Sequence, residues 1–157
     1  MKHILLTAAF LSLAPLAGAT AVNVSYSEDF AEKLSDDYGD REGVKLSEEI
    51  TEDLIREFEK QGLSVARVDV MIVDAKPNRP TFKQLGDRPG LDPIRSISIG
   101  GMSLEGTAYD AEGNVLGTKE YDWFENDLRD AIGSGTWTDA RRASDRFARK
   151  FATDLAD

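Results

Sequence analysis

The chain has 157 residues, of which 41% are hydrophobic and 31% are charged, and its formal net charge is −10. It contains no cysteine and a single histidine, His3. A chain of this length and composition suits one compact domain, and it excludes collagen-like, disulfide-stapled and globally disordered proteins.

The first segment is typical of a secretory signal peptide. Lys2 precedes an apolar run over residues 4–16, and small residues at positions 17 and 19 fit a signal-peptidase site. This run is shorter than the ~20 apolar residues that cross a bilayer. We therefore predict a signal peptide over residues 1–19 and a single periplasmic or secreted domain over residues 20–157 that does not span a membrane. Cleavage after Ala21 fits the same rule.

Removal of the predicted signal peptide changes which chemistry is open to the chain. It takes away His3, so the mature chain is predicted to have neither imidazole nor thiol. These groups are required for Ser-His-Asp and Cys-His catalysis and for the usual zinc, copper, haem and iron–sulfur sites. Lys2 is also removed, which leaves 18 basic against 29 acidic residues, a net charge of −11. We expect no cofactor, no metal and no nucleic-acid partner.

Periodic patterns predict a strand and two helices in the N-terminal half. Residues 21–26 alternate and include β-branched side chains, which favours a strand. Ser27 is a suitable N-cap for one or two helical turns, and the polar stretch over residues 35–44 indicates a solvated break. A second helix is predicted after its N-cap, Ser47, because apolar residues recur every four positions as far as Phe58.

Three further strands follow. Residues 63–74 alternate with apolar residues on both faces, which predicts a central strand covered on both sides. Longer strands are predicted over 94–109 and 115–124, joined by a type I turn with a bulge over 110–114. The register that follows from this turn pairs Tyr109 with Val115, Glu105 with Lys119, and Gly101 with Trp123.

A last helix, capped at Thr136 or Thr138, is predicted from a stripe of small and apolar residues that continues to Leu155. The element order β-α-β-β-β-α predicts an α+β fold, with a mostly antiparallel four-stranded sheet and two main helices packed on one face. The crossover through the first helices makes the first two strands parallel if both belong to the sheet.

Two features resemble known groups of proteins. Residues 76–85 (KPNRPTFKQL) with 98–101 (SIGG) resemble uncharacterised small secreted or periplasmic bacterial α+β proteins. The element order resembles accessory domains of bacterial envelope-assembly proteins. These resemblances imply a small secreted domain and assign no role to any residue.

The segment over residues 75–93 is the most unusual in the chain. It holds four of the five prolines and is locally basic. Loops of this length inside compact domains are uncommon and often functional. We predict that it contacts a protein or an anionic cell-envelope component through Arg79, Lys83, Arg88 and Phe82. In the alternative interpretation, the prolines stiffen a connection and the cations neutralise the acidic second helix.

Paired carboxylates are the one enzymatic arrangement that the composition fully permits. Four acidic residues lie on or beside the predicted hairpin, close to Tyr121 and Trp123, whose rings can stack on a sugar: Glu105, Glu120, Asp122 and Glu125. A carbohydrate hydrolase is therefore the alternative function. Because the chain has 29 acidic residues, neighbouring acids also arise by chance, and we assign no catalytic residue.

Overall fold

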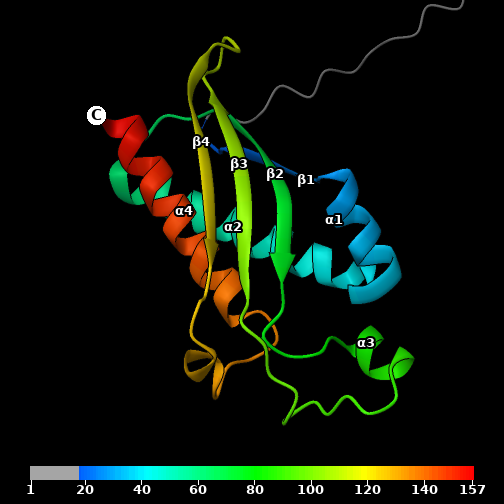
Figure 1. Ribbon diagram of the computed structural model, residues 1–157. Helices are drawn as coiled ribbons and strands as arrows, with labels where there is room; N and C mark the ends of the chain where they lie inside the picture. The colour runs from blue at the N-terminus through cyan, green and yellow to red at the C-terminus, as the bar shows by residue number, and fades with distance from the viewer. Residues whose placement is uncertain (1–17) are drawn as a thin grey trace, which may run out of the picture.

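One β-sheet, with two long helices on a single face, organises residues 18–157, which are the residues that the computed structural model describes (Figure 1). The strands lie in the order β1 (Ala21–Tyr26), β2 (Arg67–Lys76), β3 (Gly101–Tyr109) and β4 (Val115–Phe124). The long helices are α2 (Asp40–Gln61) and α4 (Thr138–Ala156). The short helical segments are α1 (Glu28–Lys33), the π-helix η1 (Leu34–Tyr38), α3 (Phe82–Asp87) and the 3₁₀ helix η2 (Leu128–Ala131). Residues 1–17 of the predicted signal peptide lie outside the described residues.

The sheet is mixed. The predicted α+β class and the four strands are confirmed, but the expectation of a mostly antiparallel sheet is wrong, because β1 pairs with β2 in parallel while the other two pairs are antiparallel. The chain between β1 and β2 runs through α1, η1 and α2, which carry it back to the end of the sheet at which β1 began. The hydroxyl of Thr20 donates to the Val65 carbonyl at 2.8 Å, and the Ala21 N–H donates to the Ala66 carbonyl at 2.9 Å.

Helix α2 begins earlier than its predicted N-cap, Ser47. It starts at Asp40, directly after Gly39, whose φ of 97° turns the chain out of the π-helix. The predicted solvated break over residues 35–44 is therefore wrong. Tyr38 of η1 and Leu46 of α2 are both buried, so apolar side chains anchor this stretch to the core. The helix ends at the predicted stop, Gly62, which adopts the left-handed conformation.

The hairpin register differs from the prediction by one bulge. Tyr109 pairs with Val115 as expected, but Ala108 pairs with Gly117. The extra residue, Leu116, shifts every later pair, so that Glu105 faces Glu120 and Gly101 faces Phe124. Lys119 consequently points to the helix-covered face, where its Nζ lies 2.5 Å from Asp154 of α4.

The core lies between the sheet and the two long helices. Its largest fully buried side chains include Phe58 of α2 and Phe147 and Phe151 of α4. The opposite face of the sheet is not part of this core, since Met71 and Val73 of β2 stay half-buried there. The prediction that this strand is covered on both sides is therefore wrong.

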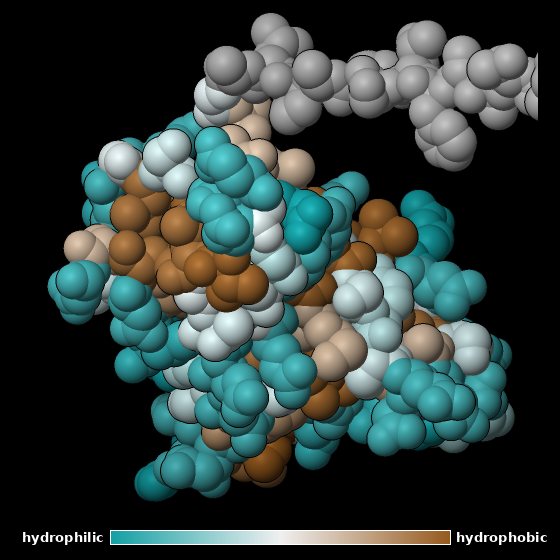
Figure 2. All heavy atoms as spheres, turned by 90° about the horizontal axis from the view of Figure 1, so that it is seen from above, coloured by the Kyte–Doolittle hydropathy of each residue, from teal (hydrophilic) through white to brown (hydrophobic). Residues whose placement is uncertain are grey.

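The hairpin end of the molecule carries apolar surface. Seen from that end, apolar side chains gather in one area and hydrophilic ones border it (Figure 2). Val115 and Leu116, at the start of β4, are 57% and 45% exposed. No helix within residues 18–157 combines the length and the apolar character needed to cross a membrane.

Gly106 of β3 sets the distance between the sheet and α4. A Cβ atom on this residue would lie 2.8 Å from Phe147 Cζ and 3.0 Å from Phe151 Cε1. We expect Gly106→Ala to reduce the free energy of unfolding by about 1–3 kcal/mol, because two well-packed rings must move. Urea denaturation measures the change. Gly86→Ala, in α3 with nothing within 4 Å of its Cβ position, is the control and should be neutral or slightly stabilising; equal losses in both variants would contradict this packing role.

Candidate functional site

The connection between β2 and β3, residues 77–100, lies at the end of the sheet opposite the hairpin (Figure 1). We call it the α3 loop. It is longer than predicted, because β3 begins at Gly101 and the predicted strand over 94–109 loses its first residues. Asp92 explains part of the difference, since its Oδ1 accepts from the N–H groups of Ile94 and Arg95, both at 2.7 Å. This local turn competes with strand pairing.

Helix α3 gives the loop a defined local structure. The Thr81 hydroxyl accepts from the Gln84 N–H at 3.3 Å, and the Gln84 side chain accepts from the Thr81 N–H at 3.1 Å. This reciprocal capping box satisfies two backbone donors at the helix start. The side-chain amide of Gln84 also donates to Asp37 of η1 at 2.9 Å, which ties α3 to the π-helix.

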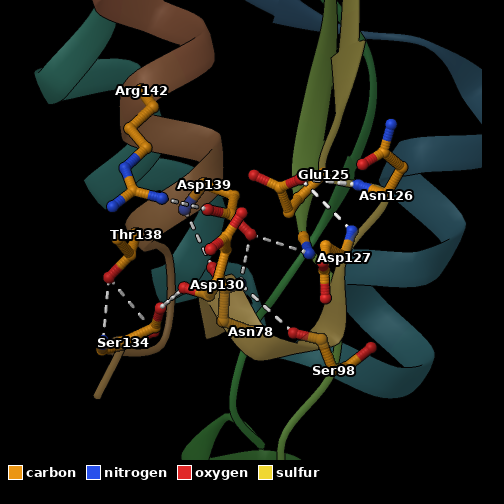
Figure 3. Close-up of polar contacts among 12 residues, drawn as sticks. Asn78, Ser98, Glu125, Asn126, Asp127, Asp130, Ser134, Thr138, Asp139 and Arg142 are labelled. Atoms are coloured by element: carbon orange, nitrogen blue, oxygen red, sulfur yellow. Dashed lines mark hydrogen bonds and ion pairs between the residues drawn. The ribbon is translucent and has the colours of Figure 1, made fainter. Parts of the chain in front are cut away.

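Asn78 fastens the α3 loop to the start of α4. It is fully buried, and its side-chain amide donates to the Ser98 carbonyl at 3.2 Å and to the carboxylate of Asp139 (Figure 3). Its side-chain oxygen accepts from the Asp139 N–H at 2.8 Å. The carboxylate of Asp139 also accepts from the Gly100 N–H at 3.1 Å and from Arg142 at 3.0 Å. Both ends of the loop therefore meet at one buried pair of side chains.

The three predicted cations of the loop have different partners. Lys83 lies 2.5 Å from Asp87, which raises the pKa of its ammonium group, and Arg88 pairs with Asp37. Arg79 instead donates to two backbone carbonyls, those of Ser134 and Ile94. Among residues 18–157, Arg79 is the one of these three cations that has no carboxylate partner. The structure does not bring the three charged groups together at one point.

Phe82, the fourth predicted residue, begins α3 and is 83% exposed. It lines a groove of about 450 Å³ between the α3 loop and the start of α4. We call this the α3 groove. Its apolar lining includes Pro80, Phe82, Leu85, Pro93 and Trp137, and its cations are Lys45, Arg79 and Arg141. Lys45 pairs with Glu42 at 2.8 Å, and Arg141 pairs with Glu49 at 3.2 Å.

A second cavity, which we call the Tyr38 pocket, lies on the other side of Arg79 and Pro80 and measures about 320 Å³. The π-helix η1 contributes Asp37 and Tyr38 to it. Neither residue was predicted to belong to a site, because the polar composition of residues 35–44 favoured a solvated break. Short π-helical segments are rare and often occur at functional sites. The buried Leu34 four positions before Tyr38 was the available signal.

The hydroxyl of Tyr38 has altered acid–base behaviour. Burial, with the nearby carboxylates of Asp74 and Asp37, raises the pKa of Tyr38 to about 12, and Arg88 partly offsets this effect. The ring also meets Trp137 of the α3 groove edge to face, with 5.6 Å between the ring centroids. Tyr38 therefore presents a neutral hydroxyl to the pocket at all ordinary pH values.

The acidic residues of the alternative hydrolase are only partly brought together. Glu105 and Glu120 face each other across β3 and β4 on the uncovered side of the sheet, beside a hollow of about 330 Å³. Asp122 pairs with Ser103, and Glu125 lies beyond the strand, where its carboxylate accepts from the Asn126 N–H at 2.8 Å. Within residues 18–157, no three side chains of the metal-binding kinds gather into a group that could hold an ion.

Loss of the Asn78 side chain should loosen the α3 loop. We expect Asn78→Ala to reduce the free energy of unfolding by about 2–4 kcal/mol, because the buried N–H and carboxylate of Asp139 each lose a partner. Urea denaturation gives the stability, and hydrogen exchange shows whether the loop opens. Asn126→Ala, at an exposed position, should change neither quantity. An equal effect of the two substitutions would contradict the anchoring role.

The raised pKa of Tyr38 predicts a loss of stability in alkali. The folded protein holds this proton more tightly than the unfolded chain, whose ordinary pKa is 10.0. The contribution is complete below pH 10 and is lost as the pH rises towards about 12. Ultraviolet titration of tyrosinate should show one of the four tyrosines ionising last, and Tyr38→Phe should remove that step. Persistence of the late step in Tyr38→Phe would assign it to another residue.

The comparisons with known proteins add no functional assignment. No protein-family model matches the chain, and neither the curated proteins nor the solved structures contain a significant match.

Proposed function

We propose that this protein is a non-enzymatic periplasmic or secreted binding domain that contacts a protein partner through the α3 groove. The observation that carries the proposal is the exposure of Phe82, 83% of whose surface faces solvent on a well-anchored loop. A phenylalanine that contributed only to the core would be buried. Aromatic side chains beside a groove are frequent anchors of protein interfaces.

The loop is held in place before any partner arrives. Asn78 and Asp139 fix its two ends, and the capping box of Thr81 and Gln84 fixes α3. A partner that binds such a loop does not have to order it, and the entropy cost of association is correspondingly small. This supports a recognition surface over a flexible connector.

The charges beside the groove indicate what the partner carries. Arg79, Lys45 and Arg141 lie around an apolar floor in a chain whose net charge is −10. The charge of Arg79 is not neutralised by a carboxylate within residues 18–157. A partner segment that places an apolar side chain against Phe82 and a carboxylate near Arg79 complements both features. Lys83 and Arg88, which pair with Asp87 and Asp37, do not line the groove.

Site-specific crosslinking tests the proposal. A photo-crosslinking residue at position 82 should capture one defined protein from periplasmic or secreted extract, whereas the same residue at position 116 should not. Leu116 is the matched control because it is also exposed and apolar but lies at the hairpin end. Phe82→Asp should then weaken binding of the captured protein at least about tenfold, which is the loss expected of an interface anchor, and Leu116→Asp should leave it unchanged.

The contribution of the groove cations to affinity is tested separately. Substitution of Lys45 and Arg141 by Gln removes two salt-bridged cations that line the groove, and substitution of Lys83 and Arg88 by Gln removes two salt-bridged cations that do not line it. The first variant should lose more affinity for the captured protein. Equal capture at positions 82 and 116, or capture of a phosphate-bearing envelope component with no protein, would overturn the proposed function.

A further inference from the structure

A ladder of aromatic and charged side chains joins β4 to α4. Three residues of β4 on the helix-covered side meet three residues of α4 in reverse order, and these pairs are Lys119 with Asp154, Tyr121 with Lys150, and Trp123 with Arg146. The guanidinium carbon of Arg146 lies 4.2 Å from the centroid of Trp123, and Lys150 Nζ lies 6.0 Å from the centroid of Tyr121. These are cation–π distances, so the rings hold both cations in place.

Stacking leaves the hydrogen-bond donors of these cations free. A ring face attracts the positive charge but accepts none of the N–H groups at the edge of a stacked guanidinium. Within residues 18–157, neither Arg146 nor Lys150 forms an ion pair with a carboxylate or donates a side-chain hydrogen bond to another residue. Many of the other cations are paired, as expected of a chain with 29 acidic and 19 basic residues. Two fixed, unpaired cations four residues apart are therefore unusual here.

The two cations lie beside a hollow on the surface of α4. It measures about 550 Å³ and is lined by Arg146, Arg149, Lys150, Thr153 and Asp154. Its acidic neighbours are already neutralised: Asp154 pairs with Lys119 at 2.5 Å, and Asp145 pairs with Arg149 and, at 3.1 Å, with Arg56. Among the described residues that line this hollow, Arg146 and Lys150 are therefore the cations whose charge no carboxylate balances.

We propose that Arg146 and Lys150 form a binding site for a ligand that carries two neighbouring phosphate groups. Side chains four residues apart on a helix lie about 6 Å from each other, which allows each cation to contact one phosphate of a diphosphate. Arg146 contributes in-plane N–H donors that match phosphate oxygens, and Lys150 contributes a mobile point charge. This site uses none of the side chains of the α3 groove, so it does not depend on the proposed function.

Nuclear magnetic resonance with inorganic pyrophosphate tests the site. Addition of pyrophosphate at constant ionic strength should shift the indole N–H of Trp123 and the Nε–H of Arg146 along one saturable curve. The double variant Arg146→Gln, Lys150→Gln should bind at least about tenfold more weakly, a loss typical of charge-assisted phosphate contacts. Urea denaturation of the same variant confirms that it folds.

A control variant with the same net charge as Arg146→Gln, Lys150→Gln shows whether pyrophosphate binds at these two residues or responds only to the total charge of the protein. Arg95→Gln with Arg129→Gln also removes two exposed cations, but at the loop end of the molecule, and should leave pyrophosphate binding unchanged. Arg146→Lys should retain part of the affinity, because it keeps the charge and loses the planar donors. The proposal is overturned by an equal loss in the two double variants, by a linear response without saturation, or by the same shifts with sodium chloride.

Discussion

The buried contact between Asn78 and Asp139 is the interaction on which the arrangement of the α3 loop depends. It joins two residues that are 61 positions apart, one in the α3 loop and one in the first turn of α4. A carboxylate that is fully buried requires several donors, and Asp139 receives them from an amide side chain, a backbone N–H and an arginine. Together with the hydrogen bond from Gln84 to Asp37, this contact holds the loop that carries α3 and Phe82.

Local signals predicted the parts of the fold that local interactions determine. The turn after Tyr109, the stop at Gly62 and the final amphipathic helix were all visible as short patterns with a direct physical cause. A bulge was expected within the turn over 110–114, but the extra residue at Leu116 of β4 was not, and it changed the partner of Glu105 from Lys119 to Glu120. Register errors of this kind arise because a turn motif fixes the pairing next to the turn and does not indicate a further bulge in the strand that follows.

The candidate site was predicted in part. Of the four residues predicted to contact a partner, Arg79 and Phe82 line the α3 groove and Lys83 and Arg88 do not, and their role in binding stays a prediction. Lys45, Arg141 and Trp137 were missed, since they come from two helices that only the tertiary fold brings to this end. The capping box of Thr81 and Gln84 was readable in the sequence and was overlooked, because the density of prolines around it favoured an irregular loop. Asn78 had no signal, since its partners are distant in the chain.

The hydrogen bonds at the start of β1 bear on how the chain matures. Thr20 and Ala21 each donate one bond to the segment just before β2. If the predicted leader is removed after Ala19, both donors stay and the sheet edge keeps its full length. If it is removed after Ala21, both donors are lost. The new charged amino terminus is then Val22, which lies next to its partner Val68 in β2. Cleavage at the earlier of the two predicted points would therefore keep both hydrogen bonds.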